Sequence, residues 1–158
     1  MKRIFLAIIL GLVLCGVSFA DNNTAERYPY KVKITSNSLY SGKVLEYYLT
    51  SDKMIVFGKL KRLDSPKELF SRELTEDERK KITDFLATFP LDKLQNEYFP
   101  KDNTILDGYA FGFSFKLDKN NVKEIRLANT YQKELHQLVE EINSFLPEKL
   151  KIFTVWEK

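Results

Sequence analysis

Cysteine is almost absent from this sequence, because Cys15 is the single example among 158 residues. A lone cysteine forms no disulfide within the chain, so no cross-link of that kind stabilises the fold. Beyond residue 15, a cysteine–histidine catalytic pair and cysteine-ligated zinc are excluded as well. Stability must come from packing, for which 12 Phe and 8 Tyr supply large apolar surfaces.

Histidine and glycine are also scarce. The single histidine, His136, follows the apolar Leu135 by one helical position, about 100° around the axis, so we expect it at a boundary or in water. His136 and Glu140 are spaced to share a metal, but two ligands do not hold zinc. The six glycines form no phosphate-binding loop, and the oxygen-rich stretches at 102–108 and 118–120 lack calcium-loop spacing. We predict no metal and no cofactor.

Neither sign of charge dominates the chain. The chain has 25 Lys and Arg residues and 22 Asp and Glu residues. Lys2 and Arg3 lie in the N-terminal segment discussed next, so the net charge of the rest of the chain is close to zero. A nucleic-acid partner therefore has no electrostatic support. Catalysis by a pair of carboxylates stays open, because 22 acids form many possible pairs.

A long apolar run occurs only at the N-terminus, over residues 4–17. It follows Lys2 and Arg3 and precedes the small residues Ser18 and Ala20, which is the order of a secretory signal peptide. We predict cleavage after residue 20 and export of the protein to the periplasm or the medium. A membrane anchor is the alternative, but spanning a bilayer takes about 20 apolar residues and this run is shorter.

A third hypothesis for the N-terminal segment is that it makes the protein a lipoprotein anchored through Cys15. Residues 12–16 resemble a bacterial lipobox, in which the cysteine is lipidated and becomes the first residue. In this sequence Leu14 stands where that motif has a small residue. After cleavage we expect no transmembrane segment, a flexible polar leader over 21–29, and one domain over 30–158.

Periodicity predicts the elements of that domain. Residues 75–89 read as a helix, because Thr75 and Glu78 form a capping box and Pro90 follows. A second helix is expected over 131–145, with Tyr131 on its buried face and Asn129 or Thr130 as its cap. Alternation and turn residues predict strands over 30–34, 44–50, 54–60, 69–74, 108–117, 122–128 and 150–156.

The resulting order is β-β-β-β-α-β-β-α-β. Strands joined by tight turns form an antiparallel sheet, and each helix has one apolar stripe to bury. The predicted fold is therefore an α+β domain in which both helices pack on one face of the sheet.

The clearest strand, 108–117, also carries the candidate site. Aromatic residues alternate with the small residues Ala110, Gly112 and Ser114, so the two kinds face opposite sides of the sheet. The small side predicts a shallow groove that Tyr47 or Tyr48 would wall. The alternative is that these small residues occupy an exposed or crowded sheet face.

Function is predicted mainly by exclusion. The leading hypothesis is a non-catalytic binding or inhibitor-like module of a bacterial envelope, with an envelope protein or polymer as partner. The alternatives are a carboxylate-based envelope hydrolase and a structural or assembly component. The sequence leaves the oligomeric state open.

Overall fold

A computed structural model describes residues 30–38, 43–59, 65–100, 109–117 and 121–152. The predicted signal peptide with Cys15, the predicted leader over 21–29 and the oxygen-rich stretches at 102–108 and 118–120 lie outside the described residues. In the described part of the chain, no helix is long and apolar enough to cross a membrane.

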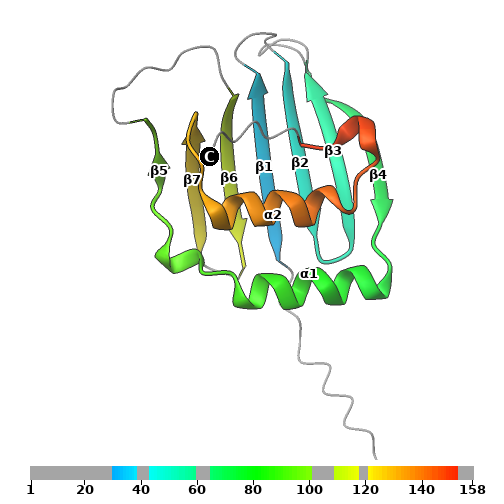
Figure 1. The fold of residues 1–158 in the computed structure, drawn as a ribbon. Coiled ribbons are helices and arrows are strands. Elements are labelled where there is room, and N and C mark those ends of the chain that lie inside the picture. The colour runs from blue at the N-terminus through cyan, green and yellow to red at the C-terminus, as the bar shows by residue number, and fades with distance from the viewer. Residues whose placement is uncertain (1–29, 39–42, 60–64, 101–108, 118–120, 153–158) are drawn as a thin grey trace, which may run out of the picture.

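A seven-stranded sheet forms the backbone of the fold, in the order β4-β3-β2-β1-β6-β7-β5. The pairs are antiparallel except for β5, which runs parallel to β7, so the sheet is mixed rather than wholly antiparallel as predicted. Figure 1 shows the arrangement. The strands are β1 (Lys31–Ser38), β2 (Val44–Thr50), β3 (Lys53–Lys59), β4 (Lys67–Glu73), β5 (Glu97–Tyr98), β6 (Tyr109–Lys116) and β7 (Val122–Ala128).

Two helices cover one face of this sheet, which confirms the predicted α+β architecture. In Figure 1, α2 (Lys133–Asn143) crosses the middle of the strands, and α1 (Glu76–Thr88) lies nearer the end where β2 turns into β3. The predicted capping box is present: Thr75 Oγ1 accepts from the Glu78 N–H at 3.3 Å, and a Glu78 oxygen accepts from the Thr75 N–H at 2.9 Å. The helix ends at Thr88, with Phe89 as its C-cap before Pro90.

The start of α2 differs from the prediction. Its N-cap is Gln132, which makes no capping hydrogen bond through its side chain, rather than Asn129 or Thr130. Asn129 has φ 46°, in the left-handed region that asparagine tolerates, and follows the end of β7 directly. Tyr131 lies before the helix and is 42% exposed, so the helical period did not apply to it.

The final predicted strand is not seen in the described residues. The chain forms a 3-10 turn, Glu148–Leu150, and residues 153–158 lie outside the described part. Asn143 holds this segment, because its side chain donates to the Ile152 carbonyl at 3.0 Å and accepts from the Ile152 N–H at 2.7 Å. A second 3-10 turn, Leu91–Lys93, follows α1.

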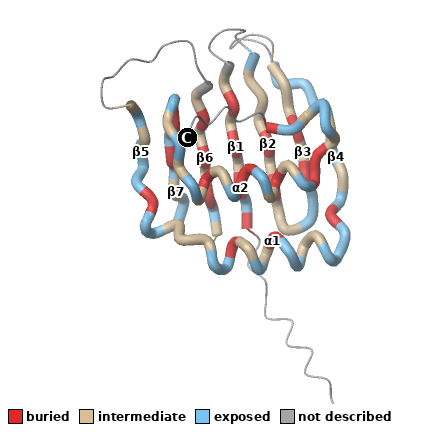
Figure 2. The backbone as a smooth tube through the Cα atoms, viewed as in Figure 1, coloured by how far each residue is buried: buried red, intermediate tan, exposed pale blue. Residues whose placement is uncertain are grey.

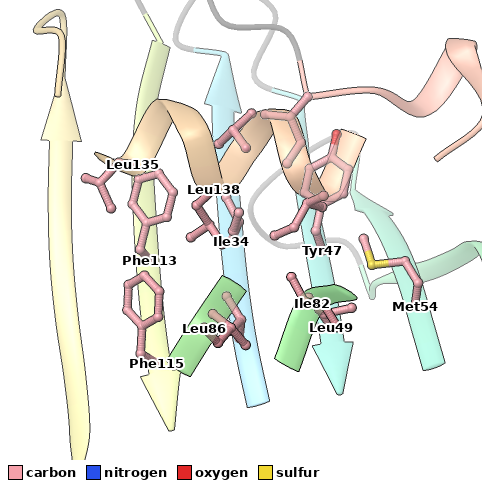
Figure 3. Close-up of a cluster of buried hydrophobic side chains, with 14 of the residues drawn as sticks. Ile34, Tyr47, Leu49, Met54, Ile82, Leu86, Phe113, Phe115, Leu135 and Leu138 are labelled. Carbon is pink, nitrogen blue, oxygen red and sulfur yellow. The ribbon is translucent and has the colours of Figure 1, made fainter. Parts of the chain in front are cut away.

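The core fills the space between the sheet and the two helices (Figure 3). Every second residue of the inner strands points into it, as the alternation in β6 predicted. Phe89 from the end of α1 stacks on Phe115, with ring centroids 5.6 Å apart. The buried strand residues are Val32, Ile34, Tyr47, Leu49, Met54, Val56, Phe111, Phe113, Phe115, Ile125 and Leu127, and they meet Ile82, Leu86, Leu135, Leu138, Val139 and Ile142 of the helices.

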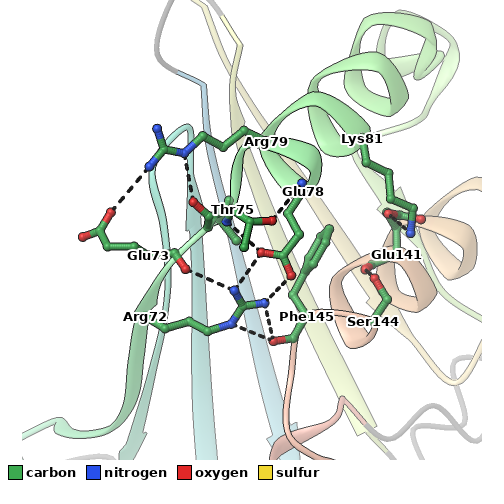
Figure 4. Close-up of polar contacts among 10 residues, drawn as sticks. Arg72, Glu73, Thr75, Glu78, Arg79, Lys81, Glu141, Ser144 and Phe145 are labelled. Atoms are coloured by element: carbon green, nitrogen blue, oxygen red, sulfur yellow. Dashed lines mark hydrogen bonds and ion pairs between the residues drawn. The ribbon is translucent and has the colours of Figure 1, made fainter.

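One arginine links three elements at the edge of this core (Figure 4). Arg72 of β4 donates to both carboxylate oxygens of Glu78 in α1, at 2.7 and 2.8 Å. It also donates to the carbonyl of Phe145, just beyond α2, at 3.2 Å. The hydrogen bonds from Arg72 lower the pKa of Glu78 to about 2. The network therefore fixes how both helices sit against the sheet edge.

Candidate binding surface

The structure places Ala110, Gly112 and Ser114 on the face of β6 that points away from the helices, opposite Phe111, Phe113 and Phe115. All three small residues are partly exposed. In Figure 2 the buried positions of the central strands alternate with partly exposed ones. We call the helix-free side of the sheet the open face. No described helix covers it.

Of the two tyrosines predicted to wall a groove, only Tyr48 lies on the open face. It is separated from Ser114 by β1, because Tyr48 pairs with Lys33 and Lys33 pairs with Ser114. Tyr47 is a correction to the prediction: it points into the core and is 1% exposed. Its burial raises the pKa of the Tyr47 hydroxyl well above the ordinary value.

The small residues form a continuous strip along β6, and none of them lines either of the two cavities described below. On one side they border Lys33, Thr35 and Asn37 of β1. A Cβ atom added to Gly112 would come no closer than 3.9 Å to the side chain of Thr35, which is ordinary van der Waals contact. The packing of the described chain therefore does not require a glycine here, and the strip leaves room for the approach of another molecule.

A carboxylate organises the centre of the open face. Glu46 Oε1 lies 3.4 Å from both Lys33 Nζ and Lys59 Nζ, and the Tyr48 hydroxyl donates to Oε2 at 3.0 Å. Partial burial by itself raises the pKa of Glu46, but the hydroxyl and the two ammonium groups outweigh it and lower the pKa below its ordinary value. Glu46 is therefore ionised, and one carboxylate is shared by two lysines.

The same cluster holds Tyr48 in place. Its ring meets Phe57 edge to face, with centroids 5.6 Å apart and planes at 89°. The ammonium groups of Lys33 and Lys31 lie 5.1 and 5.7 Å from the ring centroid, within the range of cation–π attraction. The open face thus presents a partly exposed aromatic pair with cations next to it.

His136 lies on α2, away from the open face. Its Nε2 is 3.2 Å from Glu140 Oε1, and its ring packs 5.6 Å from that of Tyr131. The predicted spacing to Glu140 is therefore realised as a pairwise contact. Among the described residues, no three His, Cys, Asp or Glu side chains come close enough together to hold a metal.

Two cavities that the sequence did not predict lie beside α1. One has a volume of about 430 Å³ and includes Arg79, Asp52 and Tyr30 in its lining. The other has a volume of about 570 Å³ and includes Asp92 and Glu124. They share Leu86, Ala87 and Leu117, so they adjoin along the helix. Their lining comes from segments far apart in the sequence, which is why periodicity gave no sign of them.

No protein-family model matches this chain, and no curated protein matches it in sequence. Function must therefore be inferred from the surfaces that the fold presents.

Proposed function

We propose that this protein is an exported, non-catalytic binding module of a bacterial envelope and that it binds its partner through the open face. The observation that carries the proposal is the helix-free side of the sheet, where small residues adjoin an organised cluster of aromatic and charged side chains. Aromatic side chains are enriched in protein interfaces, and complementary charges across an interface steer partners together. A small ligand needs a concave site, and none of the three small residues lines either of the two cavities, so we favour a macromolecular partner for this face.

The larger cavity beside α1 favours a second candidate, a carboxylate-based hydrolase. Asp92 and Glu124 both line this cavity. Paired carboxylates are the groups that glycoside hydrolysis uses as acid, base or nucleophile. Glu124 also pairs with Ser114 of β6, so Asp92, which lies beyond α1, is the residue whose substitution separates the two candidates.

Export gives the first testable prediction. The protein recovered from producing cells should begin at Asp21, because Ser18 and Ala20 present the small side chains that a signal peptidase accepts. Intact mass spectrometry decides the point. A mass that begins at Cys15 and carries acyl chains would instead identify a lipoprotein, and an unprocessed mass would contradict cleavage.

Site-specific photocrosslinking tests the binding surface. A photoreactive residue at Ser114, on the open face, should give a saturable adduct with an envelope component. The same residue at Lys80, which is exposed on α1, serves as the matched control and should give none. Adducts from Lys80 alone would refute the open face as the site. Turnover of an envelope glycan that is lost in the Asp92→Asn and Glu124→Gln variants would favour the hydrolase instead.

A further inference from the structure

Three lysines occupy neighbouring register positions of β1 and β6 on the open face. In the antiparallel pairing of β1 with β6, Lys31 lies directly opposite Lys116, and Lys33 lies directly opposite Ser114. Directly opposed residues in such a pair have Cβ atoms about 4.5–5.5 Å apart. We call Lys31, Lys33 and Lys116 the lysine cluster, and the Ser114 hydroxyl occupies the fourth corner of this arrangement.

The positive charge of the lysine cluster is poorly compensated. Lys33 reaches Glu46, but Lys59 shares that carboxylate. Lys31 contacts the ring of Tyr48. Among the ion pairs of the described residues, none joins Lys31 or Lys116 to an acid. Like charges directly opposite each other destabilise a sheet, so the fold retains a repulsion that a bound anion would relieve.

The surroundings of the lysine cluster indicate which anion fits. On one side Ser114 and Gly112 give a strip of small residues, and on the other Tyr48, Ile55 and Phe57 give a partly exposed apolar surface. A polysaccharide would bind by stacking on an open aromatic ring, but Tyr48 already contacts Phe57 and two ammonium groups. Glu124 pairs with Ser114 and places a negative charge at the margin, so the positive charge is confined to separate lysines instead of forming the continuous basic surface that attracts an anionic membrane. Separate carboxylates beside apolar side chains suit this surface best.

We propose that the lysine cluster binds carboxylates of an acidic protein segment that lies across β1 and β6, over Ser114 and Gly112. The proposal rests on the proposed function, because it names the partner's chemistry for the same face. The segment's carboxylates pair with Lys31 and Lys116, and its apolar side chains contact Tyr48 and Phe57. Glu46 is a positioning residue here, because it contacts the Lys33 ammonium group and accepts a hydrogen bond from the Tyr48 hydroxyl. The ammonium groups of Lys31 and Lys116 are then left to bind the partner.

Poly-L-glutamate is the probe for this chemistry, titrated into the full chain while amide NMR shifts are followed. The expected shifts map to β1 and β6, and the Lys31→Gln/Lys116→Gln double variant weakens binding about tenfold, equivalent to about 1.4 kcal/mol. The matched control is Lys80→Gln/Lys93→Gln, which removes the same charge from exposed positions on and after α1 and leaves binding within about twofold. Without the probe, the double variant should melt at or above the temperature of the native chain, because a repulsion has been removed.

Several results would overturn the inference. An equal loss in the Lys80→Gln/Lys93→Gln control would show general charge attraction, and no binding of poly-L-glutamate would remove the acidic segment as partner. Binding of dextran sulfate or of phosphatidylglycerol vesicles, but not of poly-L-glutamate, would reassign the partner to a glycan or a membrane. In each of these cases, a saturable photocrosslinked adduct from Ser114 would still support the proposed binding function. If Ser114 gave no adduct, the binding function and the acidic-segment inference would both be refuted.

Discussion

The Phe113→Ala variant should lose about 3–5 kcal/mol of unfolding free energy, which is the range typical of truncating a buried phenylalanine. Phe113 is 2% exposed and sits at the centre of β6, between Phe111 and Phe115. Figure 3 shows its ring in the layer between the sheet and α2, near Leu135. Truncation removes transfer energy and leaves a cavity that the sheet cannot close. Since a whole domain is stable by only about 5–15 kcal/mol, the loss is a large share.

Urea denaturation of Phe113→Ala measures this effect, with Ser114→Gln as the matched control. Ser114 is the next residue on the same strand but lies on the open face, where a longer polar side chain reaches water. The control should change stability by no more than about 0.5 kcal/mol. If Phe113→Ala left the free energy of unfolding unchanged, the aromatic side of β6 would not be part of the core. Unfolding of Ser114→Gln would show that the open face is covered in the native protein.

The faces of β6 were predictable from sequence because period-two alternation is unambiguous there. Phe111, Phe113 and Phe115 alternate with small or polar residues, so one face is inward whichever neighbours pair with it. The orientation of β2 was also predictable, because Leu45, Tyr47 and Leu49 fall on one side of the strand and Glu46, Tyr48 and Thr50 on the other. The prediction treated Tyr47 and Tyr48 as interchangeable and did not apply this alternation, which buries Tyr47. The sequence therefore predicted which way Ala110, Gly112 and Ser114 face, whereas its placement of Tyr47 beside them was wrong.

Short-range sequence motifs predicted some elements of the fold and missed others. Thr75 and Glu78 predicted the start of α1, because a capping box is formed within four residues. The two-residue strand β5 was missed, since so short a segment has no period and its pairing with β7 is long-range. The lysine cluster was likewise invisible, because Lys31 and Lys116 are brought together by strand order alone. Topology, not composition, creates this part of the surface.

The second large effect is expected at Arg72. Replacing it by methionine keeps the apolar stem but removes the paired hydrogen bonds to Glu78 and those to the Phe145 carbonyl. Hydrogen bonds to charged groups contribute about 1.5–3 kcal/mol, so we expect a loss of about 2 kcal/mol, measured by urea denaturation at neutral pH. The Arg126→Met variant is the matched control. Arg126 is 70% exposed and 3.9 Å from its partner Glu97, so its loss should cost little.

The pH dependence of stability distinguishes the charge pair from simple packing. The pKa of Glu78 is about 2 in the folded protein, held down by Arg72, and a glutamate in an unfolded chain has a pKa of about 4.3. Because the folded pKa is the lower one, the stabilisation is fully present above the unfolded value and is lost as pH falls from about 4.5 towards 2. In both Arg72→Met and Glu78→Gln, the unfolding free energy should therefore fall less over this pH range. Glutamine still serves in the capping box, so the start of α1 is kept in the Glu78→Gln variant. If the unfolding free energy of both variants fell with pH as steeply as that of the native chain, the ion pair would not be the source of the stabilisation. The contribution of Arg72 would then come from its packing and its hydrogen bond to Phe145.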